Sequence, residues 1–368
     1  MRVLLVVGRA TGGIGAHVDG LRHDLRVAGH EVVVVTAPAT AAAFGWDDAE
    51  LSWPVHAGAA AARGPLDWHR VMRLAGSVDV VHAHGHQAAV VAAVAVARAR
   101  PRPRLVVSLH NDLPPRLRTG PASRLVGWAL RRADLVTGAS DDLVALAADL
   151  GARTTELAGV ASPWVASLLA DSVPTLQERR RRAERLLEDA GLPAATGPLV
   201  LTVSRIAPQK DLMTLVQAVR RSRSGATWVV VGGGDEQLRA DVEEAAHGIP
   251  LHLLGPRDDI GAWLGAANAF VLTSRWEARA LVVQEAMAAG LPVVATRTGG
   301  LPGLLGDAGH LVEVGDAPGV ADAVDSLLSD SQQWQRRSSA GRELARGWAS
   351  PEVEARRWVD RYVAALEK

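Results

Sequence analysis

The sequence predicts an α/β protein made of two Rossmann-like domains, each with a doubly wound parallel sheet between layers of helices. The chain has 368 residues, more than a single compact core usually holds. Short apolar runs typical of buried strands alternate with amphipathic helical patterns. This alternation begins at Val3–Val7 and begins again at Leu199–Val203. We therefore expect an N-terminal domain over residues 1–170 and a C-terminal domain over residues 171–350.

The first elements follow the order of a nucleotide-binding sheet. The strand Val3–Val7 leads through a glycine-rich segment into a helix over Ala16–Ala28, and the strand Glu31–Thr36 follows. No Gly-x-Gly-x-x-Gly passes through these glycines, and no acidic residue follows the second strand, so nicotinamide dinucleotide binding is disfavoured. Gly12 and Gly13 indicate either a tight turn or a backbone that a ligand approaches closely.

A histidine marks the end of one later strand of this half. We expect further strands at 79–84, 104–109, 134–137 and 153–157. His110 follows the second of these, so it should lie at the carboxyl edge of the sheet, where it can donate a hydrogen bond near neutral pH. The alternative is that His110 only donates hydrogen bonds to nearby backbone carbonyl groups. His82 and His84 are weaker candidates, since one of the alternating pair must face the packed side of the sheet. His17, near the start of the first helix, is expected either to contact an acceptor or to be solvated.

Two cations follow the first strand of the second half. Arg205 lies on the loop after Leu199–Val203, and Lys210 lies five residues further on. A guanidinium can hold a phosphate with two hydrogen bonds, while a lysine acts as a point charge. The pair predicts a phosphate site at the carboxyl edge of the second sheet. Ion pairing at the surface is the alternative.

Two carboxylates flank the start of a later helix. Glu277 follows the strand Ala269–Thr273, and Glu285 lies within the helix that ends at Gly290. Ionised carboxylates only accept hydrogen bonds, so they suit hydroxyl groups, and a helix start suits an anion. An anion combined with several hydroxyls describes a nucleotide sugar. An ordinary amphipathic helix with a chance pair of glutamates is the alternative.

Composition excludes several classes of protein. Forty Lys and Arg balance 40 Asp and Glu, so no bulk charge attracts nucleic acid, and we expect no nucleic-acid partner. There are no cysteines, no apolar run that could span a membrane and no signal-peptide pattern, so we expect a cytoplasmic protein. The acidic pairs at 47–48 and 258–259 lack metal-site spacing, and we expect no metal. The four arginines at 179–182 are expected to form a solvated helix face.

The glutamate pair belongs to a longer motif. It is followed by Ala-Met-Ala-Ala-Gly-Leu-Pro-Val-Val-Ala-Thr and then Gly299-Gly300. This pattern resembles the donor site of retaining family 4 glycosyltransferases of GT-B fold. The resemblance implies that Glu277 contacts the hydroxyls of the donor sugar, that Glu285 contacts the ribose, and that Arg205 and Lys210 neutralise the leaving diphosphate.

The resemblance also assigns roles outside the motif. It implies that His110 contacts the donor sugar, that Gly12 and Gly13 face the diphosphate, and that the final helix packs back on the N-terminal domain, which residues 351–368 then complete. Gly232 and Gly234 are expected close to the nucleotide, and Arg257 against the base or ribose. These last three residues follow two strands of the second half.

The donor loop departs from the family pattern. Relatives usually have Glu-Gly-x-Gly or Glu-Gly-x-Pro, whereas this chain has Ala278, Arg279 and Ala280 after the glutamate, before Leu281. These four residues are expected to contact the donor. Alanine at a position of positive φ would cost on the order of 1 kcal/mol, so we expect the loop to enter the helix regularly instead.

The function implied is transfer of a hexose from a UDP- or GDP-linked sugar to an unidentified acceptor, with retention and without metal or cofactor, in bacterial cell-envelope or secondary-metabolite glycosylation. The basic, partly apolar stretch 114–133 indicates either peripheral contact with the inner face of a membrane or an ordinary surface helix. Two other functions fit the same architecture: a sugar-nucleotide epimerase, and a nucleotide-sugar-binding protein without transferase activity, which the alanine departures suggest.

Overall fold

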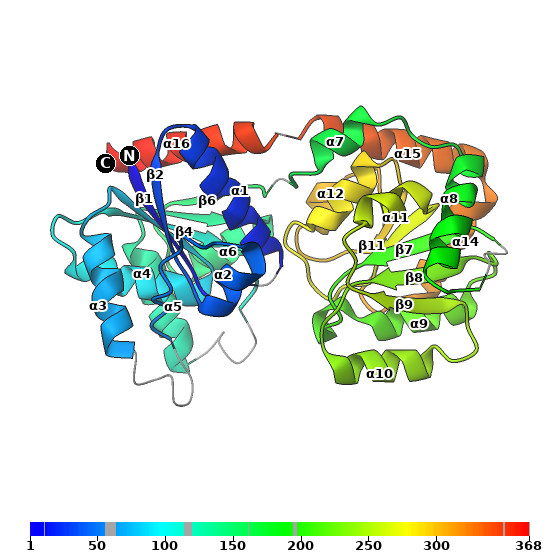
Figure 1. The fold of residues 1–368 in the computed structure, drawn as a ribbon, viewed down its shortest axis with the longest axis horizontal. Coiled ribbons are helices and arrows are strands. Elements are labelled where there is room, and N and C mark those ends of the chain that lie inside the picture. The colour runs from blue at the N-terminus through cyan, green and yellow to red at the C-terminus, as the bar shows by residue number, and fades with distance from the viewer. Residues whose placement is uncertain are drawn as a thin grey trace. The chain divides into compact units, whose positions relative to one another are not determined.

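The computed structural model describes residues 1–10, 12–55, 64–113, 120–160, 162–193, 197–348 and 350–367. The chain forms two compact units: unit 1 comprises Met1–Ala161 and Ala349–Lys368, and unit 2 comprises Ser162–Trp348. Each unit contains a six-stranded sheet, and all the strand pairs are parallel. Helices cover both faces of each sheet (Figure 1). The predicted pair of doubly wound α/β domains is confirmed.

The sheet of unit 1 has the order β2-β1-β3-β4-β5-β6. Its strands are β1 (Arg2–Val7), β2 (Glu31–Val35), β3 (Val80–His84), β4 (Arg104–Leu109), β5 (Leu135–Gly138) and β6 (Thr155–Leu157). Its helices are α1 (Gly13–Val27), α2 (Pro38–Phe44), α3 (Gly64–Ala75), α4 (His86–Arg98), α5 (Gly120–Arg132), α6 (Asp141–Asp149) and α16 (Pro351–Leu366). The order reverses between β1 and β3, which is where ligands bind in open parallel sheets.

The sheet of unit 2 has the order β12-β11-β10-β7-β8-β9. Its strands are β7 (Leu199–Val203), β8 (Thr227–Val231), β9 (Leu251–Gly255), β10 (Ala269–Leu272), β11 (Val293–Thr296) and β12 (His310–Val312). Its helices are α7 (Val165–Ala170), α8 (Leu176–Asp189), the 3₁₀ turn η3 (Pro208–Lys210), α9 (Leu212–Arg221), α10 (Glu236–Ala245), α11 (Ile260–Ala266), α12 (Leu281–Ala288), α13 (Leu301–Leu305), α14 (Ala317–Ser329) and α15 (Ser331–Arg346).

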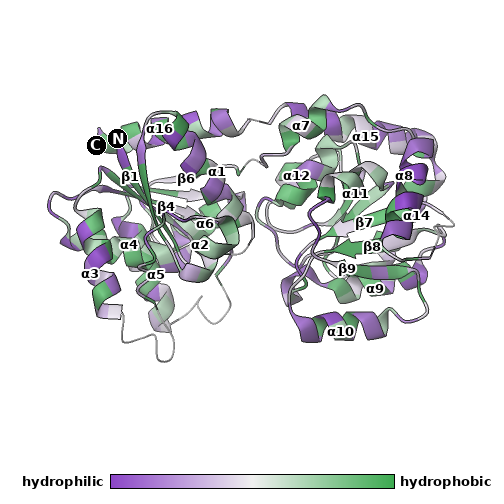
Figure 2. Cartoon of the chain, in the orientation of Figure 1, coloured by the Kyte–Doolittle hydropathy of each residue, from purple (hydrophilic) through white to green (hydrophobic). Residues whose placement is uncertain are grey.

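The central strands are buried on both faces. In β1, Val3–Val6 are completely buried, and β8 and β10 are buried along their whole length. These strands therefore show continuous apolar runs rather than alternation. The hydropathy colouring shows the same contrast, with mostly apolar strands beside helices that carry both polar and apolar residues (Figure 2).

The final helix α16 belongs to unit 1, as the resemblance implied. It packs on α1 and β4, and its Trp358 and Tyr362 are buried. The boundary falls between residues 161 and 162 rather than at the expected 170. The reason is that α7 packs on α12 and α15, where Arg342 donates hydrogen bonds to the carbonyl groups of Leu169 and Asp171.

One of the four consecutive arginines contradicts the predicted solvated face. Arg179 is fully buried, and its guanidinium donates to the carbonyl oxygens of Leu264, Ala267 and Ala289 at 2.8–2.9 Å. Burial lowers the pKa of Arg179 to about 10, which leaves it charged at neutral pH. The side chain satisfies the ends of α11 and α12, where a cation is stabilised by the helix dipole.

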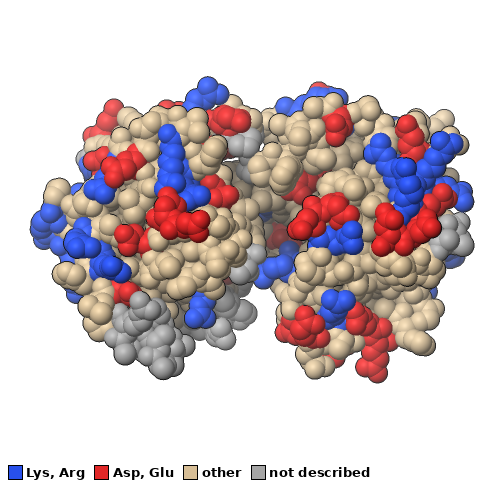
Figure 3. Space-filling model, in the orientation of Figure 1, with Lys and Arg blue, Asp and Glu red and all other residues tan. Residues whose placement is uncertain are grey.

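Surface charges of both signs lie side by side on the face drawn in Figure 3, within each unit. This mixture accords with the balance of 40 basic and 40 acidic residues. A ligand of one charge must therefore be recognised by a local arrangement of side chains rather than by a broad field.

Candidate active site

The loop after β7 is held in an unusual backbone conformation beside Lys210. Among the described residues, Asp211 is the one non-glycine residue with positive φ, at 46°. Its carboxylate pairs with Arg275 at 3.3 Å, and the Thr273 hydroxyl lies 3.1 Å from the carbonyl oxygens of both Lys210 and Asp211. Strain of this kind persists only where the surroundings enforce it, and it often occurs at functional sites. Here the strained conformation fixes the backbone position from which the Lys210 side chain extends.

Lys210 and Glu277 form an ion pair, although 67 residues separate them in the chain. Both side chains are largely buried, with 13% and 9% of their surface exposed. The Ser274 hydroxyl donates to the same oxygen, Oε1 of Glu277, at 2.6 Å. The structure thus brings together one predicted cation and one predicted carboxylate at the carboxyl edge of the sheet of unit 2.

Arg205 differs from its predicted partner cation. It is exposed, and its side chain has no ion pair or hydrogen bond with the described residues. The surface ion pairing considered for this position is therefore not found in the described part of the chain. An arginine that pairs with no described residue, on a loop that also carries the largely buried Lys210, is available to hold an anion.

The glycines of the β8–α10 loop are required by packing within the protein. A Cβ atom on Gly232 would lie 1.9 Å from the carbonyl oxygen of Ser204, and one on Gly234 would lie 2.1 Å from that of Ile206. Ile206 donates to the carbonyl of Gly233 at 2.8 Å. These glycines therefore support the loop that carries Arg205, which explains their presence without a nucleotide.

The donor loop avoids the strain that its alanines could have caused. Ala278 and Ala280 are not among the residues with positive φ, and Ala280 is extended, with φ −63° and ψ 108°. The expected regular helical entry is wrong, because residues 278 and 279 form a bend and α12 begins only at Leu281. Gly299, with φ 50°, is required because a Cβ there would lie 1.9 Å from the carbonyl oxygen of Glu277.

Glu285 lies in the second turn of α12 and is buried. Its Oε1 accepts a hydrogen bond of 2.7 Å from the Ser162 hydroxyl. Burial raises the pKa of Glu285, an effect that the Ser162 hydrogen bond partly offsets. The neighbouring Gln284 accepts a hydrogen bond from the backbone of Ser162 at 3.2 Å. The first residue of unit 2 thus orients Glu285.

Two of the remaining predicted donor contacts are arginines with contacts of their own. Arg257 forms a bidentate pair with Asp259, at 2.7 and 2.8 Å, and lies over the ring of Trp263. Arg279 lies 6.0 Å from the ring of Trp348. The charge of Arg257 is therefore already compensated, which weakens it as a ligand for phosphate.

In unit 1, His110 lies within a group of histidines. His110 Nε2 is 3.1 Å from His84 Nδ1, and the two rings stack at 13°. The ring of His17, from α1, packs against both at 5.2 and 5.6 Å. Burial lowers the pKa of His17 to about 4 and lowers the pKa of His84 and His110 well below the usual value, so all three are neutral at pH 7. Part of His17 remains exposed, but its Nε2 is buried.

A buried chain of hydrogen bonds links a fourth histidine, His82, to α16. Tyr362 is bonded to His82 Nδ1 at 2.7 Å, and His82 Nε2 to Ser108 at 2.7 Å. Ser108 continues to Thr137 at 2.8 Å. His82, predicted to be a weaker site candidate, is thus a structural residue. Gly12 and Gly13, which the resemblance implied to face the diphosphate, are the N-cap and the first residue of α1, the helix that also carries His17.

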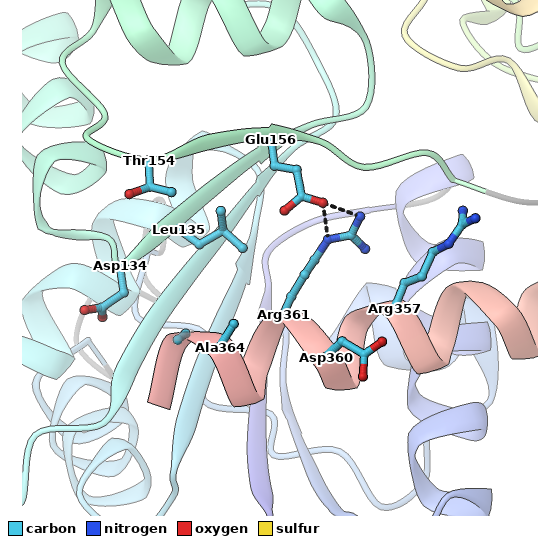
Figure 4. Close-up of a pocket in the computed structure, with 9 residues that line it drawn as sticks. Asp134, Leu135, Thr154, Glu156, Arg357, Asp360, Arg361 and Ala364 are labelled. Carbon is cyan, nitrogen blue, oxygen red and sulfur yellow. Dashed lines mark hydrogen bonds and ion pairs between the residues drawn. The ribbon is translucent and has the colours of Figure 1, made fainter. Parts of the chain in front are cut away.

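A cavity of about 580 Å³ in unit 1 contains none of the predicted site residues. Figure 4 shows it between β5, β6 and α16, where Arg361 reaches across to Glu156. These two side chains are paired at 2.7 and 2.9 Å. Asp134 and Thr154 precede their strands, so the cavity lies towards the edge of the sheet opposite His110. We interpret this cavity as a packing gap between α16 and the sheet.

Several residues of the site were not singled out from the sequence: Ser162, Asp211, Thr273 and Ser274. Ser274 adjoins the glutamate motif, and its hydroxyl after a buried strand is a signal that could have been used. The role of Ser162 depends on a contact across 123 residues of sequence, for which no local pattern exists.

Two doubly wound parallel units, with a cation and carboxylate cluster at the carboxyl edge of one sheet, define the class of GT-B glycosyltransferases. Family models support this class over both halves of the chain. "Glycosyltransferase Family 4" matches residues 11–157, and "Glycosyl transferases group 1" matches residues 197–330. The chain belongs to this glycosyltransferase family.

Curated relatives act in different pathways. Glycogen synthase of Mycobacterium tuberculosis is 30% identical, over 93% of this chain and 90% of that protein. The lipopolysaccharide core biosynthesis glycosyltransferase LpsE of Rhizobium meliloti is 30% identical over 43% of this chain, and N-acetyl-alpha-D-glucosaminyl L-malate synthase of Bacillus anthracis is 26% identical over 65%. The matched region spans about half of LpsE (48%) and 62% of the malate synthase.

Solved structures share the fold over the whole chain. Anabaena Alr3699/HepE in complex with UDP-glucose has a TM-score of 0.84 at 21% identity, covering 99% of this chain and 100% of that one. WaaG, a glycosyltransferase involved in lipopolysaccharide biosynthesis, has a TM-score of 0.71 at 15% identity, covering 98% and 99%. Within the described ranges, no helix combines the length and the apolar character needed to cross a membrane.

Proposed function

We propose that this protein transfers a hexose from a nucleotide diphosphate sugar to an acceptor hydroxyl, with retention of the anomeric configuration. The observation that carries the proposal is the cluster of Lys210, Glu277 and Ser274, with the exposed Arg205 on the same loop as Lys210. Relatives support a nucleotide-sugar donor: a mycobacterial relative is named as GDP-mannose-dependent, and the Anabaena structure contains UDP-glucose. On this support we propose a UDP- or GDP-linked sugar as the donor.

The residues of unit 2 have distinct parts in this reaction. Arg205 and Lys210 hold the diphosphate and stabilise the negative charge that develops as the bond between the sugar C1 and the diphosphate oxygen breaks. Glu277 accepts hydrogen bonds from sugar hydroxyls, and Glu285 from the ribose. On donor binding, the Lys210 ammonium turns from Glu277 towards phosphate, so the carboxylate becomes free to bind the sugar.

The proton balance needs no separate base. The acceptor oxygen forms its new bond to C1 on the face that the diphosphate leaves, and the acceptor proton passes to the departing diphosphate oxygen. The two protein cations supply the charge that a divalent ion supplies in other transferases, so the reaction proceeds without metal or cofactor. In unit 1, His110 is proposed to donate a hydrogen bond to the donor sugar.

A thermal-shift screen against UDP-, GDP- and ADP-linked sugars tests this proposal. We expect stabilisation by one nucleotide class, because a ligand that binds only the folded state raises its unfolding temperature. The protein is then incubated with that donor alone and its products are identified. Slow hydrolysis to free sugar supports a transferase, whereas an epimerised donor indicates the epimerase. Binding without turnover on any acceptor indicates a binding protein.

We also propose peripheral membrane contact through the stretch 114–133. Residues 114–119 lie outside the described ranges, and residues 120–132 form α5. There Leu125 is 48% exposed beside the exposed Arg124, while Val126 and Leu130 are buried against the unit. An exposed leucine next to arginine suits an anionic lipid surface. Sedimentation with phosphatidylglycerol vesicles should fall for Leu125→Gln, and unchanged sedimentation would leave α5 as an ordinary surface helix.

A further inference from the structure

Three histidines of unit 1 converge from three separate elements. His17 comes from α1, His84 from the end of β3, and His110 from the residue after β4. One ring nitrogen of each residue lies within 4.8 Å of a ring nitrogen of both others. The three rings are 5.2–5.6 Å apart between centroids. Such a group offers three imidazole ligands to a point between them.

The spacing is close to that of a metal site. Zinc binds histidine nitrogen at about 2.0–2.1 Å in tetrahedral geometry, so two ligand nitrogens lie about 3.3–3.4 Å apart. His84 Nδ1 and His110 Nε2 are 3.1 Å apart. The third nitrogen is within 4.8 Å, so a movement of His17 on the order of 1–1.5 Å would complete the set.

An unsatisfied nitrogen supports a role beyond packing. Nε2 of His17 is buried and has no hydrogen-bond partner among the described residues. Buried polar atoms without a partner are rare in folded proteins, and each needs an explanation such as an ion. Because burial lowers the pKa of each ring, the imidazoles are neutral at pH 7 and keep a lone pair for a metal.

We propose that His17, His84 and His110 bind one transition-metal dication of the Zn²⁺ class. Imidazole favours Zn²⁺, Cu²⁺, Ni²⁺ and Co²⁺ over Mg²⁺ and Ca²⁺, which prefer oxygen. The three-residue group contains no carboxylate, so the bound ion keeps its full charge and binds more weakly than in a thiolate site. The fourth position is left for water or a ligand hydroxyl.

The proposed ion is a regulator, not a requirement of the reaction. Because His110 is the proposed contact to the donor sugar, an ion on this residue competes with the sugar and inhibits transfer. This consequence rests on the proposed function, whereas binding of the ion does not. Absence of metal binding would therefore contradict the ion site, whereas absence of inhibition alone would contradict only the proposed role of His110 in transfer.

Titration of metal-free protein with Co²⁺ tests the site directly. We expect the visible absorption bands of tetrahedral cobalt, saturating at one equivalent and abolished by one equivalent of Zn²⁺. His17→Gln should weaken binding by at least about tenfold, and His247→Gln, at an exposed histidine of unit 2, should leave it unchanged. Absence of the bands, or equal affinity of His17→Gln and wild type, would overturn the proposal.

A second measurement uses only the wild-type chain, so it stands if a variant fails to fold. The electron paramagnetic resonance spectrum of the one-to-one Cu²⁺ complex reports the number of nitrogen ligands. Three imidazole nitrogens are expected, and one or none would indicate adventitious surface binding and contradict the site. In the activity assay, Zn²⁺ should inhibit wild-type turnover and a chelator should restore it.

Discussion

The two units share the doubly wound parallel fold but place different chemistry at the carboxyl edges of their sheets. In unit 1 the carboxyl edge carries His84 and His110, neutral rings that bond to each other. In unit 2 it carries Lys210 and Glu277, full charges that bond to each other. A diphosphate requires cations, whereas sugar hydroxyls can be recognised by neutral donors and acceptors. The comparison teaches that the fold fixes where a ligand binds, and the side chains at the strand ends decide which part of it.

The largest expected effect is a loss of turnover when a cation of unit 2 is removed. Arg205→Gln should lower kcat by roughly 100-fold or more, because it removes a charge that stabilises the leaving diphosphate. The matched control is Arg223→Gln, also exposed, which precedes β8 and lies at the opposite edge of the same sheet. Steady-state assays with the donor found by screening measure both. Equal activity of the two variants would contradict a special role for the charge at the carboxyl edge of this sheet.

A second effect concerns the backbone that supports Glu277. Gly299→Ala should lower the free energy of unfolding by about 2–3 kcal/mol, because a Cβ at 1.9 Å from the Glu277 carbonyl adds displacement to the strain of positive φ. Gly315→Ala, at φ 82° in open space, should cost only about 1 kcal/mol. Urea titration measures both variants. Similar losses would show that the contact with Glu277 is not a constraint.

A third effect separates binding from stability within α12. Glu285→Gln should weaken donor binding by about tenfold, since a charged acceptor for the ribose is lost. It should not lower the unfolding temperature at pH 8, because a neutral amide still accepts from Ser162 and removes a buried charge whose pKa is raised by burial. Calorimetric titration measures donor binding, and thermal unfolding measures stability. A less stable variant with unchanged donor binding would make Glu285 structural.

The smallest effect per residue is a difference in the response of stability to pH. The pKa values of His17, His82, His84 and His110 are lowered by burial, so the unfolded chain binds more protons below about pH 6.5. Unit 1 should therefore keep its full stability above pH 6.5 and lose it as the pH falls, by at most about 1.4 kcal/mol per pH unit for each histidine. The raised pKa of Glu285 acts in the opposite sense in unit 2, because its contribution is present at low pH and lost as the pH rises.

Hydrogen exchange resolved by peptide, corrected for the intrinsic pH dependence and measured with chelator present, compares the two units at pH 7.5 and pH 5.5. Peptides of β3 and β4 should lose protection at the lower pH more than those of β7 and β10. Equal losses in both sheets would show that the histidine group does not set the acid stability of unit 1.

Local patterns were sufficient for the elements and for part of the site. Apolar runs located β1 and β7, and the resemblance implied that Glu277 and Lys210 serve one donor site. The structure places the two residues after neighbouring parallel strands, where they form an ion pair. The burial of Arg179 could not be predicted, since its acceptors lie 85–110 residues away at the ends of other helices. The bond between His82 and Tyr362 spans 280 residues and exists only through the return of α16.

The boundary and the donor loop show a different limit. The resemblance gave the pattern of glycines that relatives have after the first glutamate, but not the backbone of Ala278 and Ala280. Those two alanines lie outside the residues of positive φ, so the departure from the family pattern introduces no strain of that kind. The position of α7 depends on Arg342 of α15, which no segment near residue 170 reveals.

Calorimetric titration with UDP and GDP, without the sugar, tests the central claim most directly. The claim is that the cations of unit 2 hold the diphosphate, while His110 of unit 1 contacts the sugar. The account predicts that Arg205→Gln weakens binding of the preferred diphosphate by at least about tenfold and that His110→Ala leaves it within about twofold of wild type. Full affinity in Arg205→Gln, or an equal loss in His110→Ala, would contradict it.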